Sequence, residues 1–340
     1  MTSTPTGTMP GPATNPGPAS YDGPASNSTP ASSSAEPVRR WPDLVKGHGT
    51  GNDFVLLTDA DAALDLDPVA VASLTDRHRG LGADGLIRAV RTQALLAVEP
   101  GLADVLGADA ARAEWFMDYR NADGSVAEMC GNGIRVYVRY LVDQGLVALP
   151  DGAALAVGTR AGVLDVRAEG DLVAVAMGRW GAPGGDGALA AGFDAEVSVA
   201  GVEGARPGLS ITMPNPHVVI AVASDAELAA ADLARPPAVV PVPSQGTNVE
   251  IVQALGERVE AGTVVGEIRM RVHERGVGET LSCGTGACAA AVAARVWAGP
   301  GAPDVWDVHV PGGTVRVVLA PDGEVELIGP AVLVADVRPR

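Results

Sequence analysis

The stretch Met129-Cys-Gly-Asn-Gly-Ile-Arg135 is repeated in altered form as Ser282-Cys-Gly-Thr-Gly-Ala-Cys288. Both stretches contain the pattern Cys-Gly-polar-Gly, and each leads into a segment that we expect to be helical. They lie about 150 residues apart, which is one domain length. The repeat therefore predicts two similar halves, each of which presents one thiol at the N-terminus of a helix.

The position of Cys130 and Cys283 indicates a specific chemistry. The unpaired N–H groups of a helix N-terminus carry about half a unit of positive charge, which biases a thiol there toward the thiolate. The flanking glycines let the backbone approach a carboxylate closely. One thiolate could take a proton from an α-carbon while the other thiol returns one to the opposite face, and the helix ends would stabilise the growing charge. We expect neither a metal nor an organic cofactor.

Composition excludes several functions. The 340 residues are enough for about two domains, and 47% hydrophobic content can fill their cores. With 24 basic and 41 acidic side chains the net charge is -17, which disfavours nucleic acid and anionic membranes as partners. Three cysteines favour a reducing cytoplasm. Lys46 is the only lysine and precedes Gly and His, which fits neither a pyridoxal phosphate site nor a phosphate-binding Gly-Lys-Ser/Thr loop.

Residues 1–40 are rich in Pro, Ser and Thr, and we expect a disordered tail that is not a signal peptide. From residue 41 onward the predicted strands outnumber the helices and do not alternate with them, which favours an α+β fold. We expect a domain boundary near residues 149–158, an inserted loop with weak helical character at 93–114, and a flexible excursion at 181–192.

The predicted helices are residues 68–78, 133–142, 225–233 and 286–298. The predicted strands are residues 54–57, 86–90, 163–167, 172–176, 218–222, 248–252, 267–273, 314–319 and 332–337.

Other interpretations of the cysteines remain open at this point. Cys288 is most simply a buried, inert side chain in an Ala-rich helix. Cys283, Cys288 and His273 could hold zinc, although their spacing matches no common ligand pattern. The stretch at 284–289 resembles a dinucleotide-binding glycine loop, but no apolar strand precedes it.

Six motifs extend the comparison beyond the cysteines: Gly47-His-Gly-Thr-Gly-Asn-Asp-Phe54, Tyr119-Arg-Asn-Ala-Asp-Gly124, Met129-Cys-Gly-Asn-Gly133, Pro214-Asn-Pro-His217, Gly246-Thr-Asn-Val-Glu250 and His273-Glu-Arg-Gly-Val-Gly-Glu-Thr-Leu-Ser-Cys-Gly-Thr-Gly286. With these motifs the chain, from about Val45 to its C-terminus, resembles the diaminopimelate epimerases. The resemblance implies two pseudo-symmetric α+β domains, each a sheet wrapped around a central helix, with the site between them. It divides the chain into residues 41–155 with 329–340, and residues 156–328.

The resemblance also implies a reaction, the interconversion of LL- and meso-2,6-diaminopimelate for lysine and peptidoglycan precursor synthesis. Cys130 and Cys283 would exchange the roles of acid and base, with His217 and Glu274 near the reacting centre. The implied substrate-binding residues are Asn52, Asn121, Gly131, Asn132, Asn215, Asn248, Arg275, Gly284 and Thr285. An Arg fork suits the far carboxylate, uncharged amides suit a zwitterion, and Glu274 can pair an ammonium.

One position departs from the family pattern, because Gly85 stands where some members carry a substrate-contacting Gln. The rival functions are a racemase for proline or hydroxyproline, an isomerase of the phenazine-biosynthesis type, and a redox-regulated binding module with a Cys130–Cys283 disulfide. The only expected partner is a small-molecule substrate. The sequence leaves the oligomeric state open, with a homodimer as one option.

Overall fold

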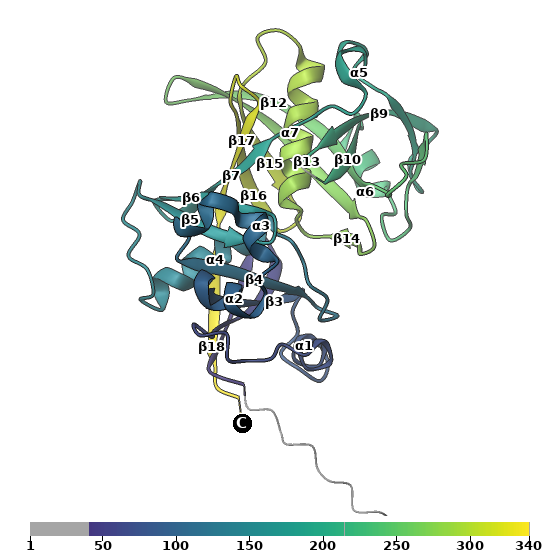
Figure 1. Cartoon of the computed structure of the whole chain (residues 1–340). Coiled ribbons are helices and arrows are strands. Elements are labelled where there is room, and N and C mark those ends of the chain that lie inside the picture. The colour runs from purple at the N-terminus through teal and green to yellow at the C-terminus, as the bar shows by residue number, and fades with distance from the viewer. Residues whose placement is uncertain (1–40, 214, 340) are drawn as a thin grey trace, which may run out of the picture. The chain divides into compact units, whose positions relative to one another are not determined.

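A computed structural model describes residues 41–213 and 215–339 (Figure 1). The tail expected at residues 1–40 lies outside these described residues. None of the helices in the described part of the chain is both long and apolar enough to cross a bilayer.

Fourteen of the strands form two series with the same pairing pattern. In each series the successive pairs are antiparallel, parallel, antiparallel, parallel, antiparallel and antiparallel. The first strand series is β1 (Leu44–Gly49), β2 (Asn52–Thr58), β3 (Gly85–Arg91), β4 (Trp115–Asn121), β5 (Ala154–Thr159), β6 (Gly162–Glu169) and β7 (Leu172–Arg179). The second strand series is β9 (Ala205–Thr212), β10 (Pro216–Ala221), β12 (Asn248–Glu260), β13 (Thr263–Glu274), β15 (Val305–Val310), β16 (Gly313–Leu319) and β17 (Glu324–Pro330).

The remaining elements lie between or beside these strands. The shorter strands are β8 (Ala195–Ser198), β11 (Ala238–Val240), β14 (Gly278–Thr280) and β18 (Val332–Val337). The helices are α1 (Pro68–Thr75), α2 (Thr92–Val98), α3 (Leu102–Leu106), the 3-10 helix η1 (Gly107–Ala111), α4 (Gly131–Asp143), α5 (Gly185–Ala191), α6 (Asp225–Ala230) and α7 (Gly284–Ala298).

Each series wraps around one buried helix that joins two parallel strands. Helix α4 connects β4 to β5 and is buried among strands of the first series, while α7 connects β13 to β15 and is buried among strands of the second (Figure 1). Residues 286–293 of α7 are all buried, and most of them are alanine, because only small side chains let a helix lie this close to strands on several sides. The predicted α+β fold with two similar halves is confirmed.

Two antiparallel strand pairs join the series. The equivalent last strands, β7 and β17, pair with each other, which makes one continuous hydrogen-bonded network. Strand β18 returns to pair with β1, as the family resemblance implied for the last strand. Strand pairing continues from one series to the next and therefore marks no division near residue 155. The domain boundary predicted there stays a prediction.

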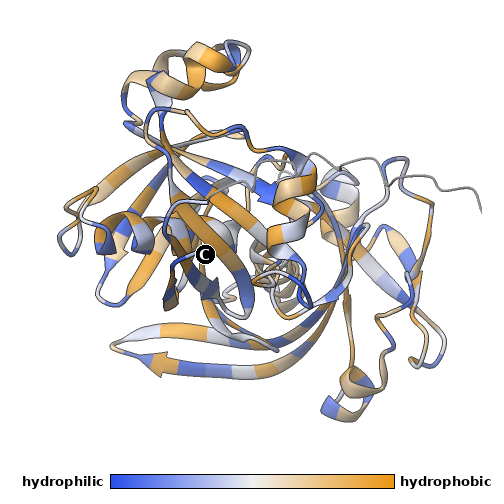
Figure 2. Cartoon of the chain, turned by 90° about the horizontal axis from the view of Figure 1, so that it is seen from below, coloured by the Kyte–Doolittle hydropathy of each residue, from blue (hydrophilic) through white to orange (hydrophobic). Residues whose placement is uncertain are grey.

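Sequence patterns found the helices better than the strands. The insert at 93–114 contains α2, α3 and η1, as expected, but the excursion predicted as flexible at 181–192 contains helix α5. Residues 154–159, predicted as part of a boundary, form β5. The strands β1, β4, β8, β9, β11, β14, β15 and β17 were not predicted. Figure 2 shows strands in which hydrophobic and hydrophilic residues alternate. The missed strands β4 and β15 instead bury five and three consecutive residues, so they lack this alternation.

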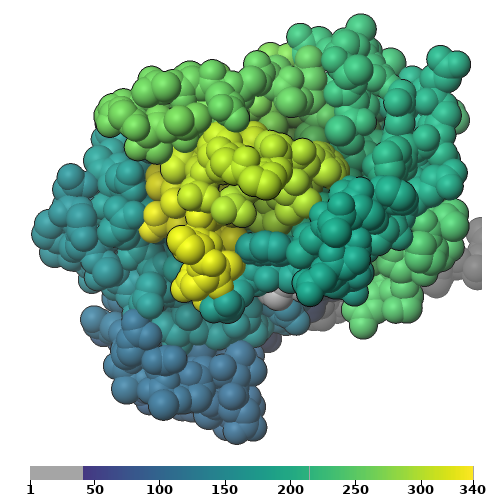
Figure 3. All heavy atoms as spheres, turned by 90° about the horizontal axis from the view of Figure 1, so that it is seen from above, coloured from purple at the N-terminus to yellow at the C-terminus, as the bar shows by residue number. Residues whose placement is uncertain are grey.

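The C-terminal end of α7 is fixed by the segment around α5. Trp297 Nε1 donates a 2.7 Å hydrogen bond to the carbonyl oxygen of Gly192. Seen from above, the α5 segment (teal) lies beside residues near 300–325 (yellow-green), with the β12–β13 hairpin (green) on another side (Figure 3). This hydrogen bond anchors the end of α7 that lies opposite Cys283.

A buried charge cluster stabilises the first series. Asp118 is fully buried and accepts hydrogen bonds from Arg88 (2.6 and 2.9 Å), Arg120 and Arg160, and Arg88 also binds Asp59 at 3.1 Å. Burial alone would raise the pKa of Asp118, but the neighbouring arginines outweigh it and lower that pKa. The cluster ties β3 and β4 to the turn between β5 and β6.

We expect Asp118→Asn to lower the free energy of unfolding at pH 7 by about 3–5 kcal/mol, because it leaves buried arginines without their counter-charge. The folded-state pKa lies below the unfolded value, so the stability is present above about pH 4 and is lost as the pH falls further. Urea unfolding should therefore show a difference between wild type and variant that shrinks below about pH 4. The exposed Asp104→Asn is the matched control; equal effects of both variants would contradict the argument.

Candidate active site

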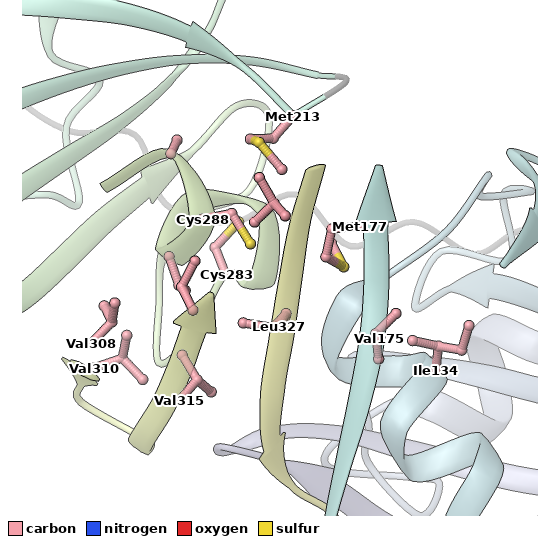
Figure 4. Packing of buried hydrophobic residues seen from close by; sticks show 14 of the residues in the cluster. Ile134, Val175, Met177, Met213, Cys283, Cys288, Val308, Val310, Val315 and Leu327 are labelled. Atoms are coloured by element: carbon pink, nitrogen blue, oxygen red, sulfur yellow. The ribbon is translucent and has the colours of Figure 1, made fainter. Parts of the chain in front are cut away.

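The N-termini of α4 and α7 meet head to head. A methyl group added to Gly131 would lie 3.5 Å from Cα of Gly284, and one added to Gly284 would lie 3.2 Å from Cα of Gly131. Leu327 of β17 and Met177 of β7 pack beside these glycines, and Figure 4 shows Leu327 near Cys283 and Met177 on the neighbouring strand. A methyl group at Gly284 would require its neighbours to shift by a few tenths of an ångström, whereas one at Gly131 would meet Gly284 at an ordinary van der Waals distance. The predicted approach of the two repeated motifs is thus observed.

Each cysteine caps its own helix through sulfur. Sγ of Cys130 accepts a hydrogen bond from N of Gly133 (3.4 Å), and Sγ of Cys283 accepts one from N of Gly286 (3.3 Å). A Cβ atom at Gly133 or Gly286 would lie 3.2–3.3 Å from atoms of the capping cysteine. The second glycine of Cys-Gly-polar-Gly is therefore the residue that makes room for a sulfur cap.

Burial, and not the helix end, dominates the thiol pKa values. Burial raises the pKa of Cys130 to about 11, although the N–H of Gly133 acts in the opposite direction. Burial raises the pKa of Cys283 well above its usual value, and the charges of Glu274 and Glu250 raise it further. The expectation that the helix ends bias both cysteines toward thiolate is wrong for this structure, because the lost hydration of the thiolate outweighs the gain from the helix N–H groups.

Glu274 lies within electrostatic reach of both thiols. Its negative charge raises the pKa of Cys130 and also that of Cys283. Burial raises the pKa of Glu274 itself, and Thr280 Oγ1 donates a hydrogen bond to its carboxylate. A cation bound at Glu274 would therefore favour the loss of a proton from either thiol.

On the side of the first series, Asn52 faces Cys130. Its Oδ1 accepts hydrogen bonds at 3.4 Å from Sγ of Cys130 and from Nδ2 of Asn132, and its Nδ2 donates to Asp84 at 2.7 Å. Asn132 also donates to the carbonyl oxygen of Ser282 at 3.0 Å, which links the first helix end to the residue before Cys283. The sequence singled out Asn52 and Asn132, but not Asp84 or Ser282.

On the side of the second series, four predicted residues form one network. His217 contacts Asn215 through Nε2 (3.0 Å) and Asn248 through Nδ1 (3.5 Å), and the backbone N–H of Arg275 donates to Oδ1 of Asn248 (2.9 Å). A fifth member, Glu250, was part of a quoted motif but was given no role by sequence reasoning. Its Oε1 lies 2.7 Å from Nδ1 of His217, and both side chains are fully buried.

Two predicted residues stand apart in their contacts. Asn121 donates to Ser125 at 2.9 Å and has no hydrogen bond to another predicted site residue in the described part of the chain. Within residues 41–213 and 215–339, the hydroxyl group of Thr285 has one hydrogen-bond contact, with Oγ1 3.5 Å from Sγ of Cys283. Gly85, the departure from the family pattern, is the strand partner of Asn121.

The structure also decides two alternative interpretations. Residues 41–213 and 215–339 contain no group of three His, Cys, Asp or Glu side chains placed to hold a metal, so the zinc hypothesis is wrong; His273 instead contacts the carbonyl oxygen of Leu233. A dinucleotide loop at 284–289 is wrong as well, because the short β14 before it pairs antiparallel with β13. All three cysteines are free.

Comparison with known families agrees with this architecture. The diaminopimelate epimerase family matches residues 44–181 and 209–334. The chain belongs to this family. The sequence resemblance is confirmed, and with it the enzyme class, an isomerase.

Relatives share most of their length with this chain. It is 48% identical over 300 residues to a diaminopimelate epimerase of Streptomyces coelicolor, covering 86% of this chain and 93% of the relative. It is 47% identical over 293 residues to one of Thermobifida fusca, covering 86% and 95%.

Solved structures show the same fold at low identity. A phenazine biosynthesis protein of the PhzF family from Bacillus anthracis has a TM-score of 0.57 at 14% identity, covering 88% of this chain and 98% of its own. A hydroxyproline epimerase from Agrobacterium vitis has a TM-score of 0.51 at 13% identity, covering 88% and 93%.

We expect Gly284→Ala to lower the free energy of unfolding by about 1–3 kcal/mol, because the added methyl group meets Gly131 and Leu327 at 3.1–3.2 Å. Gly187→Ala in α5 is the matched control, since a methyl group there meets no atom within 4 Å. That control should raise stability by about 0.5–1 kcal/mol. Chemical unfolding measures both, and a Gly284→Ala protein as stable as the control would contradict close contact of the helix ends.

Proposed function

We propose that the protein interconverts LL- and meso-2,6-diaminopimelate, with one of Cys130 and Cys283 removing the α-proton and the other delivering a proton to the opposite face of the carbon. The observation that carries this proposal is the head-to-head contact of two helix N-termini that are each capped by a cysteine. An α-carbon held between the two sulfur atoms could lose a proton to one and gain a proton from the other on its opposite face. The reaction needs no metal or organic cofactor.

The proton transfer balances without a further reactant. The thiolate forms an S–H bond as the α-C–H bond breaks, and the electron pair of that bond spreads onto the α-carboxylate. The opposite thiol then donates its proton to carbon and becomes the thiolate. Backbone N–H groups at both helix ends, beside Gly131 and Gly284, would stabilise the charge on the carboxylate. A thiol with a raised pKa suits this step, because its thiolate is a strong base toward a weakly acidic C–H group.

The other predicted residues receive roles that fit their surroundings. Glu274 would pair with the ammonium group of the reacting carbon, since its charge already acts on both thiols. His217 and the amides of Asn52, Asn132, Asn215 and Asn248 would orient the substrate near the reacting centre. Asn121 and the exposed Arg275 would contact its far end, where the Arg fork suits a carboxylate. Thr285 would support the carboxylate beside Cys283.

The biological setting follows from the same proposal. Diaminopimelate is a precursor of lysine and peptidoglycan, so the enzyme would act in the cytoplasm on a small-molecule substrate. A hydroxyproline epimerase shares the fold, so a proline or hydroxyproline racemase is the rival function. The 43–48% sequence identity to diaminopimelate epimerases over most of the chain favours diaminopimelate as the substrate. Turnover of diaminopimelate and not of proline in a substrate panel would separate the two.

We expect Cys130→Ala and Cys283→Ala each to lower the epimerisation rate by more than about a thousandfold, because either change removes one of two proton carriers. In heavy water the wild-type enzyme should incorporate deuterium at the α-carbon. Cys288→Ala is the matched control, since this buried thiol lies in the core of α7 and should leave the rate within about threefold. Full activity of either of the first two variants would exclude the two-thiol mechanism.

A further inference from the structure

The strand registers define which residues of the two series are equivalent. In the first series the parallel pair β2–β3 begins with Phe54 opposite Gly85, and in the second series the pair β10–β12 begins with His217 opposite Asn248. His217 thus occupies the position of Phe54, and Asn248 occupies that of Gly85. The backbone repeats, but polar residues replace apolar ones around the second helix end.

The same register makes Glu250 the equivalent of Ile87, two residues further along each strand. Both side chains lie against the second glycine of their motif. A methyl group at Gly133 would lie 3.3 Å from Cδ1 of Ile87, and one at Gly286 would lie 2.6 Å from Oε1 of Glu250 and 3.2 Å from Sγ of Cys283. The first turn of α4 therefore rests on a hydrocarbon, whereas the first turn of α7 rests on a carboxylate beside its thiol.

The helices themselves differ at the fifth residue after the cysteine, which is Arg135 in α4 and Cys288 in α7. Arg135 is fully buried, and its hydrogen bonds go to neutral oxygens of Gly131 (3.0 Å), Asn132 (3.0 Å), Thr50 (3.2 Å) and Pro330 (3.3 Å). Among the described residues no Asp or Glu forms a salt bridge with it. A buried cation without a carboxylate is costly, and the acidic groups that act on it are the thiols of Cys130 and of the fully buried Cys288. Of these two thiols, only that of Cys130 belongs to the proposed site.

Glu250 presents the opposite problem. Its Oε1 pairs with His217, but its buried Oε2 has no hydrogen-bond partner in the part of the chain that the structure describes. The negative charge of Glu250 raises the pKa of the neighbouring Cys283 thiol, because it disfavours a thiolate so close to the carboxylate. The buried cation of Arg135 thus favours ionisation of Cys130, and the buried carboxylate of Glu250 opposes ionisation of Cys283.

We propose that Arg135 and Glu250 are positioning residues that make the two thiols inequivalent, so that Cys130 gives up its proton before Cys283. The inference concerns the site of the proposed function, but its test needs no turnover.

The other titratable groups near the thiols do not create this difference. Glu274 of β13 acts on both cysteines with the same sign. Tyr119 of β4 is near Cys130, and burial raises its pKa, so it stays neutral in the pH range of the thiols. Asp84 acts on the first side through Asn52, where its charge would work against ionisation of Cys130. Arg135 and Glu250 are the two charges that favour ionisation of Cys130 over that of Cys283, whereas Asp84 acts in the opposite direction.

The test is the alkylation rate of each cysteine in the full-length protein, measured with iodoacetamide between pH 7 and pH 9 and resolved by peptide mass spectrometry. Arg135→Met should slow Cys130 by about tenfold, equivalent to one unit of pKa, and change Cys283 little. Glu250→Gln keeps the shape of the side chain and should speed Cys283 by about tenfold while changing Cys130 little. Cys288 should remain unmodified in every folded variant.

Three further variants separate charge from structure. Arg135→Lys keeps the positive charge and should retain the wild-type rate at Cys130; a loss equal to that of Arg135→Met would show a merely structural role and overturn the proposal. Arg139→Met on the exposed face of α4 and Glu257→Gln on the exposed part of β12 are the matched controls. The proposal is also overturned if Glu250→Gln leaves the rate at Cys283 unchanged or slows it. If the wild-type protein had no epimerase activity but the variants showed these alkylation shifts, only the proposed function would be refuted.

Discussion

The close approach of Gly131 and Gly284 is the contact on which the site depends. A Cβ atom on Gly284 would lie 3.2 Å from Cα of Gly131, which is closer than most Cβ contacts, so glycine at this position lets two buried helices meet end to end without a shift of their neighbours. Cysteine as the cap then places one sulfur on each side of this contact, and a second glycine in each motif makes room for that sulfur. The spacing of four residues, Cys-Gly-polar-Gly, thus follows from the packing of two helix ends.

The strand network explains why the two ends are fixed in place. Equivalent strands β7 and β17 pair with each other, and Leu327 of β17 contacts the glycines of both helices. Asn132 crosses to the carbonyl oxygen of Ser282, and Thr50 contacts the Ser282 hydroxyl at 2.7 Å. The repeated strands therefore make the two halves similar. The buried polar residues that link the helix ends fix the position of one end relative to the other.

The sequence predicted the repeat, the two cysteines and most of their polar neighbours, because these residues lie in short motifs with unusual glycine spacing. The predicted helices begin at residues 133 and 286, two residues later than the observed helices, because the sequence does not show that a cysteine sulfur serves as the N-cap. It missed strands such as β15 because three consecutive residues there are buried and one of them is the charged Asp307, so the strand shows no alternation of buried and exposed residues. It also gave the wrong direction for the thiol pKa values, since burial depends on the whole fold.

The raised thiol pKa values impose a condition on the proposed reaction. A thiol with a pKa of about 11 carries a thiolate in about one molecule in ten thousand at pH 7. Part of the rise comes from Glu274, whose charge acts on both cysteines, and in the proposed complex an ammonium group neutralises that charge. Substrate binding would therefore lower both thiol pKa values at once. A ligand without the ammonium group would leave the charge of Glu274 in place, so both thiol pKa values would stay higher than they are with an amino acid bound.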